Sequence, residues 1–229
     1  MPDKIRVGMV LFPDLTQLDL TGPYEVFARI PGAEVHLLAR TLDPVRSEFG
    51  LSIAPASTLA GAPQMDVLFV PGGKGIGGAI EDEQLIAFLQ RQAEGARWIT
   101  AVCTGALVLG AAGLLRGYRA TTHWLSMDLL PLVGATPVPD ARVVVDRNRI
   151  TAGGVTAGLD FGLRFAEQLH GQRVAEQIQL LIEYDPSPPF SAGSPRSAPP
   201  EVVESLRSAR RGLQESRRAA LEQAVRKWR

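Results

Sequence analysis

Short apolar runs alternate with longer amphipathic stretches through most of the chain, and this alternation constrains the fold more than any other feature. Residues 5–12, 66–70 and 98–102 are apolar on both faces, which is typical of strands buried inside a parallel sheet. The stretches between them repeat their apolar residues at helical spacing. Strands that alternate with helices predict an α/β fold with a mainly parallel central sheet and helices on both faces.

Apolar periodicity together with glycine and proline residues sets the expected boundaries. We expect strands over residues 5–12, 35–39, 51–54, 66–70, 98–102, 119–122, 142–146 and 149–151, and helices over residues 22–29, 80–94, 104–112, 156–170 and 174–184. Residues 185–200 (DPSPPFSAGSPRSAPP) contain too much proline for a helix or a central strand. The predicted organisation is an α/β domain over 1–185, a proline-rich linker over 186–200 and a C-terminal helical tail over 201–229.

The charge balance gives no reason to expect a nucleic-acid or membrane partner. The 24 basic and 24 acidic residues cancel, so bulk attraction to polyanions is not expected. No segment approaches the roughly 20 apolar residues that span a bilayer. The single cysteine excludes an intramolecular disulfide, and the N-terminus lacks the apolar region of a signal peptide. We therefore expect a cytoplasmic protein whose thiol stays reduced.

The tail combines an apolar stripe with an arginine-rich face. The stripe consists of Val202, Leu206, Ala209 and Leu213. We interpret the tail as docked on the domain or as a dimer arm with a solvated basic face, and nucleic-acid binding is the alternative.

The strongest local motif is the passage from a buried strand to a helix at Cys103. Residues 101–105 (AVCTG) match the small-x-nucleophile-x-small pattern of a nucleophile elbow, whose tight turn requires small neighbours. We expect the N-terminus of the following helix to lower the thiol pKa, and the Thr104 N–H to face charge that develops on a substrate. Cys103 is thus interpreted as a nucleophile; the alternative is a buried cysteine that only fills space.

A glycine-rich loop, residues 73–78 (GKGIGG), follows the strand at 66–70. It matches the G-x-G-x-x-G pattern of dinucleotide-binding folds, so a redox enzyme is an alternative. However, the motif is not in the first strand–helix unit, and the acidic residue about 20 positions further on, Glu94, falls at a helix end. Because neighbouring strands end near Gly73 and at Cys103, we expect the Gly73 N–H to help form an oxyanion hole, and we expect no cofactor.

Cysteine catalysis usually needs a second group that moves protons. Asp19 lies between two leucines in the expected loop after the first strand, where apolar surroundings raise a carboxyl pKa; its alternative role is an N-cap. His123 follows a strand and is assigned a supporting position behind the substrate-contacting residues. His36 and His170 are interpreted as structural. No cluster has the spacing of metal ligands, so no metal is expected.

Four motifs together resemble a known family. LDLTGP (18–23), VPGG (70–73), VCTG (102–105) and ATTHW (120–124) are similar to the ThiJ/PfpI family of the class I glutamine amidotransferase-like superfamily, and within it to the isonitrile (isocyanide) hydratases. TAGGVTAGLDF and LLIEYDPSPPFSAGSP extend the resemblance over nearly the whole chain. Sensor domains of regulators with a C-terminal helix-turn-helix share part of these motifs, but the single tail helix leaves no room for that module.

The resemblance implies a flavodoxin-like sandwich and a homodimer that acts on a small molecule. It implies Cys103 as the nucleophile, Asp19 as its carboxylate partner, and the Gly73 and Thr104 amides near the developing charge. The implied reaction is that of a hydro-lyase: isonitriles are hydrated to N-substituted formamides through a thioimidate. Thr104 replaces the histidine that many superfamily members have after the cysteine, which disfavours protease-like Cys-His chemistry.

Two other functions would use the same cysteine. One is a cofactor-independent glyoxalase that acts on small aldehydes. The other is a redox or ligand sensor in which the thiol oxidises stepwise to sulfenic and sulfinic acid.

Overall fold

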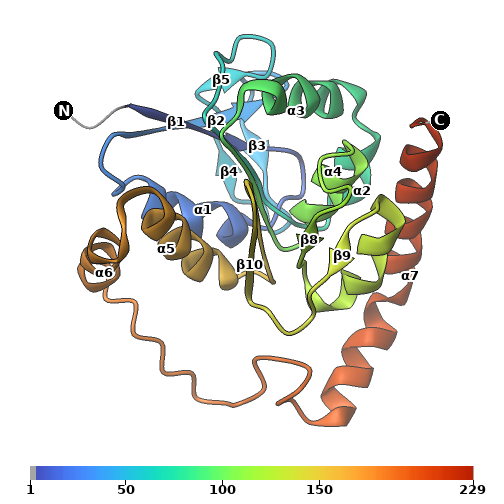
Figure 1. Cartoon of the computed structure of the whole chain (residues 1–229). Coiled ribbons are helices and arrows are strands. Elements are labelled where there is room, and N and C mark those ends of the chain that lie inside the picture. The colour runs from blue at the N-terminus through green and yellow to red at the C-terminus, as the bar shows by residue number, and fades with distance from the viewer. Residues whose placement is uncertain (1–3, 229) are drawn as a thin grey trace.

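The computed structural model describes residues 4–228, and its centre is a seven-stranded sheet with helices on both faces (Figure 1). The strands are, in spatial order, β10 (Val143–Asp146), β11 (Arg149–Ala152), β7 (Trp98–Val102), β6 (Val67–Val70), β1 (Ile5–Val10), β2 (Ala33–Ala39) and β5 (Ser57–Thr58). Neighbouring strands are parallel except for β10, which pairs antiparallel with β11. The predicted fold class is confirmed.

The helices form one layer on each face of the sheet. One layer contains α1 (Gln17–Phe27), α5 (Ala157–His170) and α6 (Gln172–Leu181). The other contains α2 (Ile76–Glu81), α3 (Glu83–Gly95), α4 (Gly105–Ala111), the 3-10 helix η1 (Trp124–Val133) and α7 (Pro200–Arg226). Two small sheets stand apart: β3 (Val45–Arg46) with β4 (Ser52–Ile53), and β8 (Arg119–Ala120) with β9 (Thr136–Pro137). Among residues 4–228, no helix has both the length and the apolar character needed to cross a bilayer.

Aromatic packing fixes the layer of α1 and α5 to the sheet. The Phe27 ring meets Phe69, Phe161 and Phe165 edge-on at centroid distances of 5.8, 5.7 and 5.4 Å. All four rings are fully buried. Such pairs contribute about 0.5–1.5 kcal/mol each beyond their burial, so the scaffold under β6 and β7 is rigid.

The order of the strands reverses at β1. The chain continues from β1 to β2 on one side, whereas β6 lies on the other side and is followed outward by β7. In open α/β sheets, ligands bind at such a reversal, beyond the carboxyl ends of the strands. The segments that follow β1, β6 and β7 meet there, and these carry Asp19, Gly73 and Cys103.

Two helix predictions are wrong in their boundaries. The helix expected at 22–29 begins at Gln17, so Asp19 lies in the first turn of α1 rather than in a loop, and Pro23 lies inside the helix. The Pro23 ring packs on α5, where a Cβ added at Gly158 would lie 2.8 Å from it. The helix expected at 80–94 is divided into α2 and α3 by Asp82, whose side chain caps α3.

Helix α7 packs on α2, α4 and η1. The Trp228 Nε1 donates to the Ala111 carbonyl oxygen (3.1 Å), and Lys227 pairs with Glu83 (2.7 Å). The predicted apolar stripe is partly wrong, because Val202 and Leu206 are 42% and 45% exposed. The side chains that α7 buries are instead Val203, Arg217, Ala220 and Leu221. The division at residues 185 and 200 stays a prediction, although residues 186–199 contain no helix or strand.

Candidate active site

Cys103 occupies a strained turn between β7 and α4. Its φ of 56° is in the left-handed region, which is uncommon for a residue other than glycine. The Cys103 N–H donates to the carbonyl oxygens of Ala152 (3.0 Å) and Gly153 (2.9 Å), and its carbonyl oxygen accepts from the Thr122 hydroxyl (2.7 Å). A Cβ at Gly105 would lie 2.1 Å from the Val70 carbonyl oxygen. The small residue two positions after the cysteine is therefore required by backbone packing.

The Cys103 thiol is buried, with an exposed fraction of 5%. Burial raises its pKa well above the usual range, and the neighbouring Asp19 charge raises it further. The main-chain N–H groups of Val155 and Thr104 bind the sulfur and lower the pKa, but by less. The expected net lowering of the thiol pKa by the helix N-terminus is therefore wrong, because burial outweighs it.

Asp19 extends from α1 to the underside of the same turn and is fully buried. Its Oδ2 accepts a hydrogen bond from the Gly72 N–H (3.0 Å). Its Oδ1 has no partner of good hydrogen-bond geometry among the described residues. Burial raises the pKa of Asp19 to about 7, although the interaction with the Cys103 thiol and the Gly72 N–H oppose the shift. Near neutral pH this carboxyl group readily gains or loses a proton.

Gly72 and Gly73 bring Asp19 and Thr104 together. A Cβ at Gly72 would lie 2.6 Å from the Thr104 nitrogen and 2.8 Å from Asp19 Oδ2, so only glycine leaves room for both. The Gly73 N–H donates to the Thr104 hydroxyl (3.2 Å). In this structure the Gly73 amide thus holds Thr104 instead of pointing freely at a substrate. The roles of both residues toward a developing charge stay predictions.

His123 lines the same cavity as Cys103. Its Nδ1 accepts from the Leu125 N–H (3.3 Å). Burial and the charges of Arg217 and Arg210 lower its pKa to about 4, so the ring is neutral at pH 7. His123 therefore lines the cavity itself instead of lying behind the residues that line it, and its role stays a prediction.

The cavity above the thiol has a volume of about 150 Å³ and is closed on one side by α7. Several lining residues were not predicted from the sequence, namely Thr16, Glu48, Leu125, Val155, Arg210, Leu213, Gln214 and Arg217. Arg217 joins α7 to the glycine loop by donating to the Gly73 carbonyl oxygen (2.8 Å). The spacing of 210, 214 and 217 places these residues on one helix face, but nothing in the sequence indicates what that face covers.

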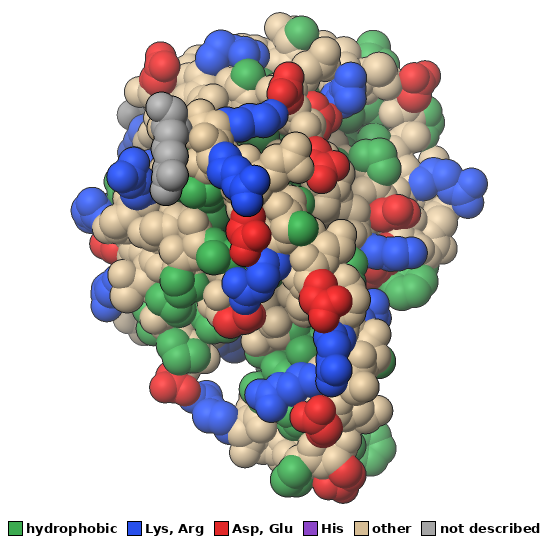
Figure 2. All heavy atoms as spheres, turned by 90° about the vertical axis from the view of Figure 1, so that its right-hand side faces the viewer, with side chains coloured by type: hydrophobic (Ala, Val, Ile, Leu, Met, Phe, Trp, Pro, Cys, Tyr) green, Lys and Arg blue, Asp and Glu red, His purple; other side chains and the backbone are tan. Residues whose placement is uncertain are grey.

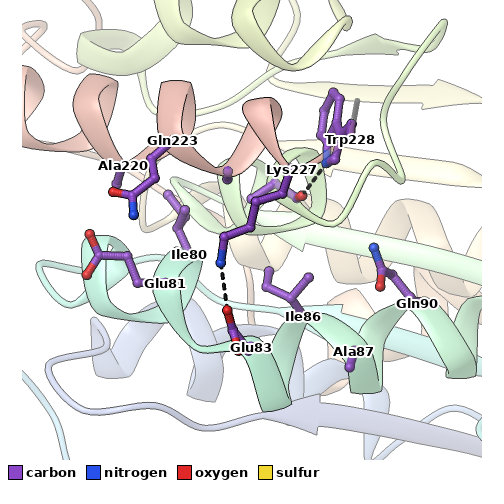
Figure 3. A pocket seen from close by; sticks show the side chains of 12 residues that line it. Ile80, Glu81, Glu83, Ile86, Ala87, Gln90, Ala220, Gln223, Lys227 and Trp228 are labelled. Atoms are coloured by element: carbon purple, nitrogen blue, oxygen red, sulfur yellow. Dashed lines mark hydrogen bonds and ion pairs between the residues drawn. The ribbon is translucent and has the colours of Figure 1, made fainter.

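A larger cavity lies elsewhere, between the end of α7 and helices α2 and α3. Figure 3 shows Lys227 extending from α7 to Glu83 across it, with Ile80 and Ile86 in its wall. Its volume is about 600 Å³, but it is lined by neither a cysteine nor a histidine. A buried nucleophile beside a carboxyl group of raised pKa indicates a functional site better than size does, so the cavity above Cys103 is the candidate active site.

A cysteine on a strained elbow, beside a buried carboxyl group at the reversal point of a doubly wound sheet, defines the class of α/β protein to which the chain is compared. The chain belongs to the DJ-1/PfpI family, whose model matches residues 5–168. This confirms the resemblance inferred from the four motifs.

The chain is similar to three known proteins in particular. It is 53% identical to isonitrile hydratase from Pseudomonas putida over 203 residues, which is 89% of either chain. A crystal structure of a ThiJ/PfpI family protein from Pseudomonas syringae superposes with a TM-score of 0.93 at 45% identity, covering 96% of this chain and 91% of that one. The HTH-type transcriptional regulator GbdR from Pseudomonas aeruginosa is 31% identical over 78% of this chain but only 50% of the regulator.

Proposed function

We propose that this protein is an isonitrile hydratase that converts R–N≡C and water to the N-substituted formamide R–NH–CHO. The observation that carries the proposal is the buried Asp19 carboxyl group, with its raised pKa, beside the Cys103 thiol. The 53% identity to the isonitrile hydratase of Pseudomonas putida supports it. The isonitrile carbon accepts a nucleophile and a proton at the same atom, and this pair supplies both.

In the first half of the proposed reaction, one proton moves through Asp19. In its reactive form the pair carries one negative charge: Asp19 is a carboxylate and Cys103 is a thiol. As the sulfur bonds to the terminal carbon of R–N≡C, Asp19 accepts the thiol proton and transfers it to that carbon. The product is a thioimidate, Cys103–S–CH=N–R, and Asp19 is again a carboxylate.

In the second half, water replaces the sulfur. Asp19 accepts a proton from a water molecule that attacks the thioimidate carbon and delivers that proton to nitrogen, which gives the tetrahedral intermediate Cys103–S–CH(OH)–NH–R. As the carbon–sulfur bond breaks and the carbonyl group forms, Asp19 accepts the hydroxyl proton and passes it to the departing sulfur, so that the thiol and the carboxylate are both restored. The Thr104 and Val155 N–H groups, which already bind the sulfur, stabilise it as it leaves with negative charge.

The test is the turnover of p-nitrophenyl isocyanide by the wild type and by Cys103→Ala. We expect the wild type alone to form the formamide, and mass spectrometry to detect an adduct on Cys103 when the reaction is quenched early. Thermal unfolding of both proteins shows whether the variant is folded. Absence of product from the wild type, together with consumption of methylglyoxal, would replace the proposal with a glyoxalase function.

We also propose a homodimer that works in the cytoplasm without nucleic-acid partners. The adjacent leucines at the end of α6, Leu180 (80% exposed) and Leu181 (70%), support an association surface, because neighbouring large apolar groups that are exposed mark interaction sites. The α7 side of the molecule shows Lys and Arg side chains intermixed with Asp and Glu, which supports a solvated face rather than a basic stripe (Figure 2). Light scattering after gel filtration tests the dimer.

A further inference from the structure

Helix α7 presents cationic side chains to the cavity above Cys103. Arg210, Gln214 and Arg217 lie on one face of the helix and line the cavity. Lys74 lines it from the glycine loop. These residues share one cavity with the thiol. The terminal carbon of a bound isonitrile must reach the sulfur, so its R group occupies the space that they line.

Arg217 is a buried cation without an ion-pair partner. Its exposed fraction is 6%. It donates to the Gly73 carbonyl oxygen (2.8 Å) and to the Ser126 hydroxyl (3.4 Å), which are both neutral acceptors. Its Nε has no hydrogen-bond partner among the described residues, and none of their carboxylates forms an ion pair with it. Buried charges are normally paired, so this one has capacity left for an anion.

Arg210 adds a second unpaired cation at the mouth of the cavity. Its side chain is exposed, and within residues 4–228 it has no ion pair. It lies close enough to Arg217 for their charges to repel. The one carboxylate that lines the cavity, Glu48, lies close enough for its charge to act on Arg217, but it forms no ion pair with it and accepts a hydrogen bond from the Thr16 hydroxyl (2.9 Å). Two like charges that face one small cavity are stabilised when an anion lies between them.

We propose that Arg217 and Arg210 bind a carboxylate on the substrate, so that the enzyme selects small isonitriles that carry a carboxylate group. This inference rests on the proposed isonitrile hydration. A guanidinium group binds a planar carboxylate through two parallel hydrogen bonds, which fixes orientation as well as charge. The cavity of about 150 Å³ accommodates only a small R group, so the carboxylate lies within a few bonds of the isonitrile nitrogen.

The test compares isocyanoacetate with isobutyl isocyanide, which has a similar shape but no charge. We expect the wild type to show a kcat/KM at least about tenfold higher for isocyanoacetate, because one charge-assisted hydrogen bond supplies a factor of this size. Arg210→Gln and Arg217→Lys should reduce that preference, mainly through KM. Arg211→Gln, the neighbouring exposed arginine outside the cavity, is the matched control and should leave both rates unchanged.

Binding of the reaction product tests the carboxylate site even in a variant that has lost turnover. N-formylglycine, the product of isocyanoacetate hydration, should bind to the wild type and to Arg211→Gln by calorimetry, and more weakly to Arg210→Gln. Equal turnover of the two isonitriles, or inhibition by inorganic phosphate as strong as by N-formylglycine, would overturn the carboxylate site while leaving isonitrile hydration in place. Failure to turn over either isonitrile or p-nitrophenyl isocyanide would overturn the proposed function and this inference with it.

Discussion

The Asp19 carboxyl group is held in place by the Gly72 main-chain N–H, at a distance of 3.0 Å from its Oδ2. Its other oxygen is buried without such a partner. One hydrogen bond does not compensate for complete burial of a carboxylate, so the pKa rises to about 7. The glycine loop therefore orients the acid, while burial sets its proton affinity.

The first prediction concerns the proton-transfer role of Asp19. Asp19→Asn keeps the shape of the side chain and its contact with Gly72 but can neither accept nor deliver a proton. We expect kcat for p-nitrophenyl isocyanide to fall by about 10²–10⁴-fold, the usual contribution of general acid–base catalysis. Asp14→Asn is the control, because Asp14 is exposed and asparagine also tolerates its left-handed conformation. Comparable activity of the two variants would remove Asp19 from the mechanism.

The second prediction concerns pH. With the thiol pKa well above the usual range and the Asp19 pKa at about 7, the pair is fully protonated in acid and gains its single negative charge near pH 7. The reaction requires the singly charged form, so kcat/KM should rise with pH through about 7 and then level off. A profile from pH 5 to 9 measures this directly. A rate that falls over the same range would show that the doubly protonated pair is the reactive form.

The third prediction concerns stability. The folded-state pKa of Asp19 lies above its ordinary value of 3.8, at about 7, so folding favours the protonated form. Asp19 therefore destabilises the fold progressively as pH rises from 3.8 to about 7, by about 4 kcal/mol in total. Asp19→Asn has no such charge. In urea titrations we expect the variant to gain stability relative to the wild type between pH 4.5 and pH 8, and a constant difference would contradict the raised pKa.

The sequence alone predicted the parts of the site that depend on local backbone geometry. The elbow at Cys103 follows from a buried strand, a nucleophile and small neighbours at fixed positions, and the convergence of Gly73 with Cys103 follows from parallel strands that end at one edge. Asp19 was identified from its apolar neighbours, although its helix begins earlier than Pro23 suggests. These inferences need no knowledge of distant contacts.

The remaining features depend on contacts between segments far apart in the chain. The sequence indicates a helix N-terminus near the thiol but not the complete burial that outweighs it, so the direction of the thiol pKa shift was wrong. Arg217 is one of several arginines in α7, and only docking of the helix on η1 and α2 distinguishes it as the buried one. The break at Asp82 depends on side-chain capping, which periodicity does not detect.

The last prediction concerns the glycine that makes the elbow possible. Gly105→Ala would place a Cβ 2.1 Å from the Val70 carbonyl oxygen. This contact is with backbone at the end of β6, so relief requires β6 or α4 to move, and we expect a loss of about 3 kcal/mol in unfolding free energy. Activity should fall as well, because the same movement displaces the Thr104 N–H from the sulfur.

Gly77→Ala is the matched control, since a Cβ at Gly77 meets no heavy atom within 4 Å and the residue lies in α2. There the methyl group should raise stability by up to about 1 kcal/mol, because alanine loses less backbone entropy in a helix than glycine. Urea midpoints of the two variants and the wild type, measured at one pH, show whether position 105 requires glycine. If Gly105→Ala unfolds at the same midpoint as Gly77→Ala, the tight approach of α4 to β6 does not constrain the elbow.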